Sequence, residues 1–186
     1  ISTSKVRNEM IIDDVITCVA RKQTPVILTR FKEHAKFLHD ALKEKADHVF
    51  LLYGDNSDKE NAEIRVKLKQ IPENESLILV ATGQKIGEGF DFPRLDVLML
   101  AAPVSFEGRL EQYVGRLNRD YVGKEAVYVY DYIDSHVRYF DKMYAKRLRT
   151  YRKMGFSIWT QELQPKQIIN AIFDSVNYTE KFEQDI

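Results

Sequence analysis

The stretch Gln112–Arg119 reads Gln-Tyr-Val-Gly-Arg-Leu-Asn-Arg and says more about the fold than any other part of the chain. On one helix, Gln112, Arg116 and Arg119 would stand at positions i, i+4 and i+7, so their side chains would project from one face. Gly115 removes side-chain bulk beside them and would let a ligand approach the backbone. Two planar guanidiniums on one face predict a clamp for a polyanion. The alternative is an ordinary solvated helix face.

Three further stretches precede this one along the chain. Pro25–Arg30 reads Pro-Val-Ile-Leu-Thr-Arg, Tyr53–Asp55 reads Tyr-Gly-Asp, and Ala81–Pro93 reads Ala-Thr-Gly-Gln-Lys-Ile-Gly-Glu-Gly-Phe-Asp-Phe-Pro. The first, the third and the Gln-x-x-Gly-Arg-x-x-Arg stretch resemble motifs IV, V and VI of the superfamily 2 helicases, in the family's order. Tyr53–Asp55 stands where that family has a short loop that touches nucleic acid. The resemblance covers residues from about 24 to 155, most of the chain.

The composition is that of a globular domain. The chain has 186 residues, of which 44% are hydrophobic and 30% charged, enough to bury a core. Its longest apolar run, Val97–Val104, is too short to cross a bilayer. The single cysteine, Cys18, permits no disulfide within the chain and favours a reducing, cytoplasmic setting. Because the formal net charge is zero, any nucleic-acid site must be a local patch. The first residue is Ile1 rather than Met, which suggests a piece of a longer protein.

Apolar periodicity predicts helices and strands that largely alternate. The segment 58–70 fits both periods, because Ile64, Val66 and Leu68 alternate, but the charges between them favour a helix. Helices are expected over 5–21 with Ser4 as N-cap, 31–45, 58–70, the motif VI stretch with Ser105 as N-cap, and 136–153. Strands are expected over 25–28, 48–53, 77–81, 97–101 and 126–130.

These elements predict an α/β fold with a mostly parallel sheet covered by helices on both faces, because each strand is almost continuously apolar. Ligands bind such sheets at the carboxyl ends of the strands. Thr29, Gly54, Thr82 and Asp131 each follow a predicted strand, so we expect the site residues to converge on one edge. The resemblance implies the three-layer, RecA-like second domain of a helicase.

Two parts of the chain are expected. Residues 1–155 would form the helicase C-terminal domain, and residues 156–186 an accessory segment that docks on it or on a partner lobe. In that segment Pro165 marks a helix start, and the mildly acidic stretch from Asp174 is expected to fray.

The sequence lacks the phosphate-binding loop that an ATP-hydrolysing lobe needs. The Gly123-Lys124 pair has Asn118 in place of the first glycine and Glu125 in place of Ser or Thr. Asp131 lacks the following glutamate of a magnesium-holding strand and is predicted to be structural. The histidines show no metal-ligand spacing, so we expect no metal in this chain. ATP and Mg²⁺ should therefore be bound mainly by a missing first lobe, and this chain alone should hydrolyse no ATP.

The resemblance implies specific roles at the nucleotide. Arg116 and Arg119 would be arginine fingers that neutralise charge on the transferring phosphoryl group, and Gln112 would support the phosphate network. The Asp91 carboxylate would lie near the ribose or bridge toward motif VI; the alternative is a turn residue before Pro93. The residues implied around the nucleotide are Gln112, Arg116, Arg119, Gly89, Asp91 and Gly115.

The resemblance also implies a nucleic-acid side. Thr82 and Gly83 would offer a hydroxyl and a backbone N–H to a phosphate, and Thr29, Arg30 and Gly54 could contact the same strand. Such contacts hold the backbone without reading bases, as a motor requires. For each residue the alternative is an ordinary strand-end cap or turn.

The helix expected over 136–153 is strongly basic. Against Asp141 it carries seven cations, Arg138, Lys142, Lys146, Arg147, Arg149, Arg152 and Lys153. The helix could bind a duplex backbone. The alternative, which aromatic anchors such as Phe140 and Tyr144 favour, is a helix packed on the sheet with a solvated basic side.

We interpret the chain as the second motor lobe of an ATP-dependent DNA helicase or translocase, acting with an N-terminal lobe of the same protein. Its motif VI begins with Glu111-Gln112 and lacks the His-Arg-x-Gly-Arg pattern of DEAD-box RNA helicases. The motif V stretch looks more like DNA helicases of the repair and restriction type, which favours duplex DNA. The alternatives are a docking module without motor activity, an RNA helicase lobe, and an ATPase that does not move on nucleic acid.

Overall fold

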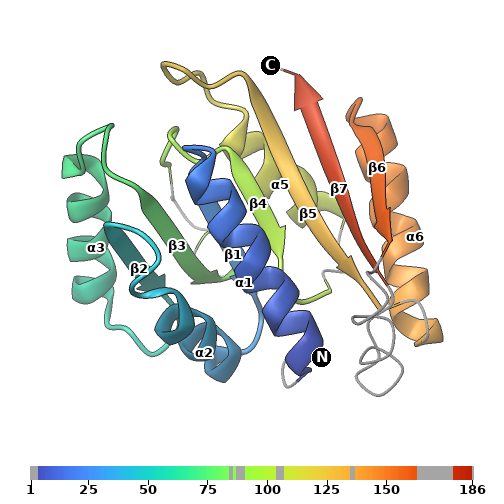
Figure 1. The fold of residues 1–186 in the computed structure, drawn as a ribbon, viewed down its shortest axis with the longest axis horizontal. Coiled ribbons are helices and arrows are strands. Elements are labelled where there is room, and N and C mark those ends of the chain that lie inside the picture. The colour runs from blue at the N-terminus through green and yellow to red at the C-terminus, as the bar shows by residue number, and fades with distance from the viewer. Residues whose placement is uncertain are drawn as a thin grey trace.

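The computed structural model describes residues 4–83, 86, 91–103, 107–134, 137–162 and 178–185. The strands are β1 Pro25–Thr29, β2 His48–Leu52, β3 Leu77–Thr82, β4 Val97–Leu100, β5 Ala126–Ile133, β6 Ser157–Glu162 and β7 Tyr178–Asp185. They form one seven-stranded sheet in the order β2-β3-β1-β4-β5-β7-β6 (Figure 1). The pairings from β2 to β5 are parallel, and those of β7 with β5 and β6 are antiparallel.

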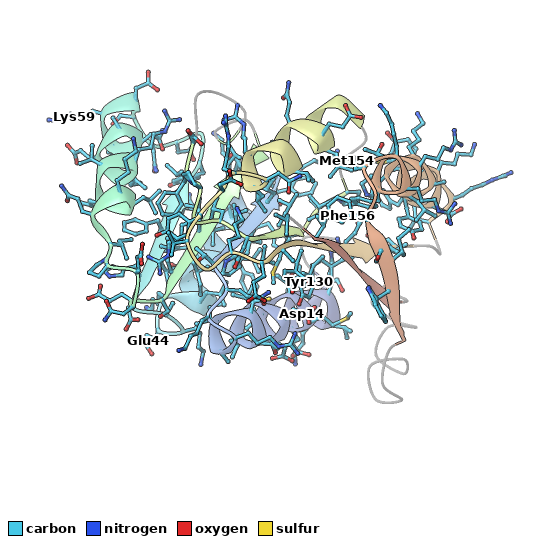
Figure 2. All side chains as sticks on the ribbon, turned by 90° about the horizontal axis from the view of Figure 1, so that it is seen from above. Asp14, Glu44, Lys59, Tyr130, Met154 and Phe156 are labelled. Carbon is cyan, nitrogen blue, oxygen red and sulfur yellow. The ribbon has the colours of Figure 1, made fainter. Side chains whose placement is uncertain are left out.

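Helices cover both faces of this sheet. They are α1 Lys5–Ala20, α2 Lys32–Leu42, α3 Asp58–Gln70, α5 Glu107–Leu117 and α6 Arg138–Lys153. α1 and α2 pack on one face and α3, α5 and α6 on the other, each side with its own hydrophobic cluster. Figure 2 shows α1 and α5 on opposite sides of the sheet. Strands β1, β3 and β4 are buried at every residue, as a sheet covered twice requires. The three-layer α/β prediction is confirmed.

Side-chain caps explain where two helices begin. The Ser4 hydroxyl accepts the Arg7 N–H at 3.3 Å and starts α1 as predicted. The Ser57 hydroxyl accepts the Glu60 N–H, while the Glu60 carboxylate accepts the Ser57 N–H at 2.7 Å. This reciprocal box pairs two backbone N–H groups that the first turn of a helix would otherwise leave without an acceptor. It explains why the ambiguous segment 58–70 is a helix.

The C-terminal segment contributes strands to the same sheet. β7 pairs with β5 along its whole length, and β6 pairs with β7 at the edge. The expected fraying from Asp174 is therefore wrong over residues 178–185, because β5 would otherwise expose its unpaired backbone groups along that side. The helix start expected at Pro165 lies outside the described residues. The division at residue 155 stays a prediction.

The strand β5 is longer than the sequence predicted. The strand was expected to stop at Tyr130, but it continues to Ile133, so Asp131 lies inside it and is fully buried. Arg147 on α6 donates to both carboxylate oxygens, at 2.6 and 2.9 Å, and the Tyr151 hydroxyl donates at 3.0 Å. These partners compensate the buried charge, so the strand can continue through it. Asp131 has the structural role that the sequence predicted.

A second buried pair lies on the opposite face of β5. Arg7 on α1 donates from Nη1 to the Asp134 carboxylate at 2.8 Å. Its Nε and Nη2 both donate to the Ala101 carbonyl oxygen at 3.2 Å. Arg7 therefore joins α1 to the ends of β4 and β5.

Replacing Arg147 with Met should lower the free energy of unfolding by about 3–5 kcal/mol, because Asp131 would stay buried without its cation. Urea unfolding of the chain, followed by circular dichroism, measures the change. Arg149→Met is the matched control: the same helix loses an exposed arginine, and we expect a change within about 0.5 kcal/mol. Equal stabilities of the two variants would contradict the role of Arg147 in compensating the buried charge of Asp131.

Candidate nucleotide and nucleic-acid sites

The predicted site residues lie at two edges of the sheet instead of one. Thr29 and Thr82 end β1 and β3 side by side at the carboxyl edge, where Gly83 follows. Asp91 precedes β4, and Arg119 follows α5 on the way to β5, so both belong to the amino edge. Thr29, Gly54 and Thr82 converge on the carboxyl edge as predicted, Asp131 lies inside β5, and Asp91 and Arg119 lie at the amino edge. Arg119 reaches that edge because α5 runs back across the sheet and carries the motif VI residues with it.

The motif VI residues do not all lie on one helix. Gln112 is exposed, Arg116 is half-buried, and Gly115 faces open space, with no atom within 4 Å of where a Cβ would stand. α5 ends at Leu117, so Arg119 lies beyond the helix and the predicted i+7 position is wrong.

Lys124 ends α5 by taking up its last carbonyl groups. Its ammonium donates to the carbonyl oxygens of Leu117, of Arg119 at 3.1 Å and of Pro93 at 2.9 Å. A lysine that satisfies terminal carbonyls replaces the next helical turn. Burial lowers the pKa of Lys124, and the Asp96 carboxylate opposes that shift. The sequence predicted no role for Lys124 beyond a failed phosphate loop, although a lysine just after a helix end is itself a capping signal.

Asp91 and Arg119 meet at the amino edge. The Arg119 Nε lies 4.0 Å from an Asp91 carboxylate oxygen, and both side chains are more than 60% exposed. This is the bridge toward motif VI that the resemblance implied for Asp91. Beside the pair opens a cleft of about 280 Å³, lined by Leu68, Lys69, Ile71, Asp91, Phe92, Pro93, Arg94 and Tyr121. Gly89 lies outside the described residues.

At the carboxyl edge, Thr29 is part of a buried network. Its hydroxyl accepts the Phe31 N–H at 3.3 Å and lies 3.1 Å from His34 Nδ1, while His34 Nε2 lies 2.9 Å from the Asn8 side-chain oxygen. Because that oxygen can only accept, Nε2 donates and Nδ1 accepts from Thr29. Burial, reinforced by Arg7, lowers the pKa of His34 to about 4. The cap role of Thr29 is therefore the one that the structure shows.

The other residues of this edge differ in exposure. Thr82 is buried, Gly83 is partly exposed, and Arg30 and Gly54 are exposed. The Arg30 guanidinium lies over the Phe31 ring at 4.7 Å from its centre. A Cβ on Gly54 would lie 3.2 Å from the Lys32 side chain, so a bulky residue would disturb Lys32 there. The structure thus brings together Gly83, Arg30 and Gly54 as accessible groups at one end.

A family match identifies this arrangement. The model of the helicase conserved C-terminal domain matches residues 7–120, more than half of the chain. The chain belongs to this family. The match includes both the carboxyl-edge residues and the motif VI stretch.

The helicase C-terminal domain of this chain has viral relatives. It is 32% identical over 120 residues to the transcript termination protein A18 of Yaba-like disease virus, covering 63% of this chain and 24% of that protein. It is 33% identical over 118 residues to the putative helicase 161L of invertebrate iridescent virus 6, covering 62% of this chain and 22% of that protein. The chain therefore spans about a quarter of the length of these relatives.

Solved helicase structures share the fold. The structure of T4 UvsW matches with a TM-score of 0.52 and 24% identity, over 65% of this chain and 23% of that one. Domain 2 of the DEAD-box helicase Mss116p, bound to an RNA duplex, matches with a TM-score of 0.52 and 19% identity, over 66% and 47%. The chain thus has the RecA-like α/β fold of superfamily 2 helicase C-terminal lobes.

The basic helix α6 lies beyond the family match. Arg147 is buried against Asp131 and does not belong to the basic surface, contrary to its inclusion in the predicted set. Tyr144 is buried and Phe140 half-buried, as the packing alternative requires, whereas Tyr139 is 65% exposed. The remaining cations are exposed on the outer side of the helix: Arg138, Lys142, Lys146, Arg149, Arg152 and Lys153.

Within the residues that the structure describes, no group of three or more His, Cys, Asp or Glu side chains could hold a metal ion. No helix in the described part of the chain is long and apolar enough to cross a membrane.

The His34 network should make stability depend on pH. Because the pKa of His34 is about 4 in the folded chain and about 6.5 for an ordinary histidine, the unfolded chain binds a proton between these pH values and the folded chain does not. The free energy of unfolding should therefore fall as pH drops from 6.5 toward about 4, by at most about 1.4 kcal/mol per pH unit for one proton. Asp96 opposes this trend, because burial raises its pKa to about 6 and the folded chain gains stability below that value.

Urea unfolding at stepped pH, with wild type and His34→Gln, separates the two groups. The variant keeps Asp96 and loses the histidine, so its stability should fall less steeply below pH 6.5 than that of the wild type. Parallel curves would show that His34 is not held neutral by its burial.

Proposed function

We propose that this chain is the second motor lobe of an ATP-dependent DNA helicase or translocase. ATP and Mg²⁺ would be bound mainly by an N-terminal lobe of a longer protein, and this chain would act across the cleft between the lobes. The observation that carries the proposal is the separation of the two groups of residues. The groups suited to a nucleotide lie at the amino edge, those suited to a phosphate backbone lie at the carboxyl edge, and α5 spans the sheet between them.

The amino edge supports the nucleotide role. Arg119 and Asp91 are exposed, and their contact at 4.0 Å is weak, so the guanidinium can turn toward a phosphate at little cost. Half-buried Arg116 and exposed Gln112 lie on the last two turns of α5, and Gly115 leaves the surface beside them open. Arg116 and Arg119 would act as arginine fingers and Gln112 as their support. Gly89, Asp91 and Gly115 would border the nucleotide.

The carboxyl edge supports the nucleic-acid role. Gly83, Arg30 and Gly54 are accessible there, and a backbone N–H or a guanidinium binds phosphate without reading bases. Thr82 and Thr29 are buried, so their part would be to hold the backbone of this edge in place. Duplex DNA is the proposed substrate, because the motif V stretch looks like that of repair- and restriction-type DNA helicases. The relatives are described as a putative helicase and as transcript termination proteins.

Two further parts of the proposal concern the whole protein. Residues 1–155 would be the motor domain and residues 156–186 an accessory segment that completes the sheet. We place the protein in the cytoplasm, a proposal supported by Cys18, which is a buried thiol and not part of a disulfide.

Replacing Arg116 with Ala in the full-length protein should abolish nucleic-acid-stimulated ATP hydrolysis. An arginine finger contributes roughly 10³–10⁵ in rate, so turnover should fall by at least about a thousandfold. ATP hydrolysis is measured with duplex DNA, with duplex RNA and with neither. Arg21→Ala removes an exposed arginine at the end of α1, on the face of the sheet opposite α5, and should leave turnover unchanged.

Each other outcome selects an alternative. Full turnover in a folded Arg116→Ala protein would leave a docking module in place of a motor lobe. Stimulation by RNA alone would identify an RNA helicase lobe, and hydrolysis indifferent to both nucleic acids would identify another kind of ATPase.

A further inference from the structure

One hydrogen bond joins the carboxyl edge of the sheet to α5. Gly83 follows β3 at the carboxyl edge, and its carbonyl oxygen accepts the Tyr113 hydroxyl at 2.8 Å. Tyr113 lies on α5, next to Gln112 and three residues before Arg116. Tyr113 is 3% exposed and Gly83 is partly exposed, so the bond is buried on the tyrosine side. The residue proposed to touch nucleic acid is thus tied directly to the helix that carries the proposed finger.

The fit between the two residues is tight. A Cβ on Gly83 would lie 2.7 Å from the Tyr113 hydroxyl oxygen, closer than real Cβ atoms come to other heavy atoms. The next nearest atom, the ring carbon that bears the hydroxyl, would lie at 3.6 Å, an ordinary contact. Gly83 does not have a positive φ, so glycine is needed here for the close approach and not for its backbone freedom.

The rest of Tyr113 is anchored in the core. Its ring belongs to the same hydrophobic cluster as Leu110, Val114 and Leu117 of α5, so this part of the helix has a fixed seat on the sheet. Because close-packed interiors transmit displacement rather than absorb it, a shift of the Gly83 carbonyl moves α5 through the hydroxyl. Arg116 lies one turn further along the same helix and moves with it.

We infer that Tyr113 is a positioning residue that couples nucleic-acid contact at Gly83 to the placement of the Arg116 finger. Phosphodiester backbone bound at the end of β3 sets the position of the Gly83 carbonyl. Through the Tyr113 hydroxyl, that position sets α5 and the guanidinium at the opposite edge. This inference rests on the proposed motor function.

Tyr113→Phe in the full-length protein removes the hydroxyl and keeps the ring in its seat. Stimulation of ATP hydrolysis by nucleic acid should fall about fivefold, the effect of one lost hydrogen bond. Hydrolysis without nucleic acid should stay within about twofold of wild type, because the packed ring still holds α5. The measured quantity is the ratio of stimulated to unstimulated turnover at saturating nucleic acid.

Tyr132→Phe is the matched control. It removes the hydroxyl of another buried tyrosine, which donates to Asp14 at 3.1 Å on the opposite face of the sheet. It should lower thermal stability about as much as Tyr113→Phe does. It should leave the stimulation ratio unchanged, because Tyr132 contacts neither Gly83 nor α5 in this hydrogen bond and does not connect the two proposed sites.

A second pair of variants tests the contact itself. Gly83→Ala should lower both the melting temperature and the stimulation ratio, because its methyl group meets the Tyr113 hydroxyl. Combining Gly83→Ala with Tyr113→Phe removes the clashing oxygen, so the melting temperature should recover to that of Tyr113→Phe alone. The stimulation ratio should not recover beyond that variant, because the coupling bond is still missing.

An unchanged ratio in Tyr113→Phe, beside a stimulated wild type, would overturn the coupling role and leave the motor function intact. Failure of the double variant to recover in melting temperature would overturn the Gly83–Tyr113 contact. A wild-type protein that hydrolyses ATP without any response to DNA or RNA would overturn the proposed function, and the coupling role with it.

Discussion

Two buried arginine–carboxylate pairs hold the three layers together at β5. Arg147 reaches Asp131 from α6, and Arg7 reaches Asp134 from α1, on opposite faces of the strand. Removing a charge from water is costly unless its partner is placed with good geometry, so neither pair tolerates a misplaced helix. Arg7 also takes up the Ala101 carbonyl oxygen beyond β4, which fixes the two strand ends relative to each other. At the carboxyl edge, the ends of β4 and β5 are therefore held together through α1.

α5 connects this carboxyl edge to the amino edge of the sheet. The helix begins after β4 at the carboxyl edge and ends at Leu117 near the amino edge, so it crosses the sheet between the two proposed sites. Its inward side packs in the same cluster as β3 and β4, and its outward side carries Gln112 and Gly115. A single packed helix can thus report on both sites.

The sequence predicted the layers well because apolar periodicity is a local property of the chain. It placed Asp131 at a strand end because the compensating Arg147 lies on a helix sixteen residues later and is a tertiary partner. It extended α5 to Arg119 because the Lys124 contacts that end the helix depend on the folded turn. β6 and β7 were missed because Ser157–Glu162 and Tyr178–Asp185 mix polar and apolar residues and pair across a long connection. The motif residues were recognised, but their division between two edges follows only from the path of α5.

At the amino edge, Lys124 holds the backbone in place while the side chains of Asp91 and Arg119 stay exposed. Its ammonium holds three carbonyl groups, that of Pro93 before β4, that of Leu117 at the end of α5 and that of Arg119 just beyond it, so the backbone around Asp91 and Arg119 is set by the chain itself. The side chains of these two residues, in contrast, meet only at 4.0 Å and are mostly exposed. An exposed ion pair of this kind contributes about 0–1 kcal/mol, far less than a charged hydrogen bond to a phosphate in a closed cleft. With a fixed backbone and loosely held side chains, a phosphate of the proposed nucleotide would take Arg119 from Asp91 without disturbing α5.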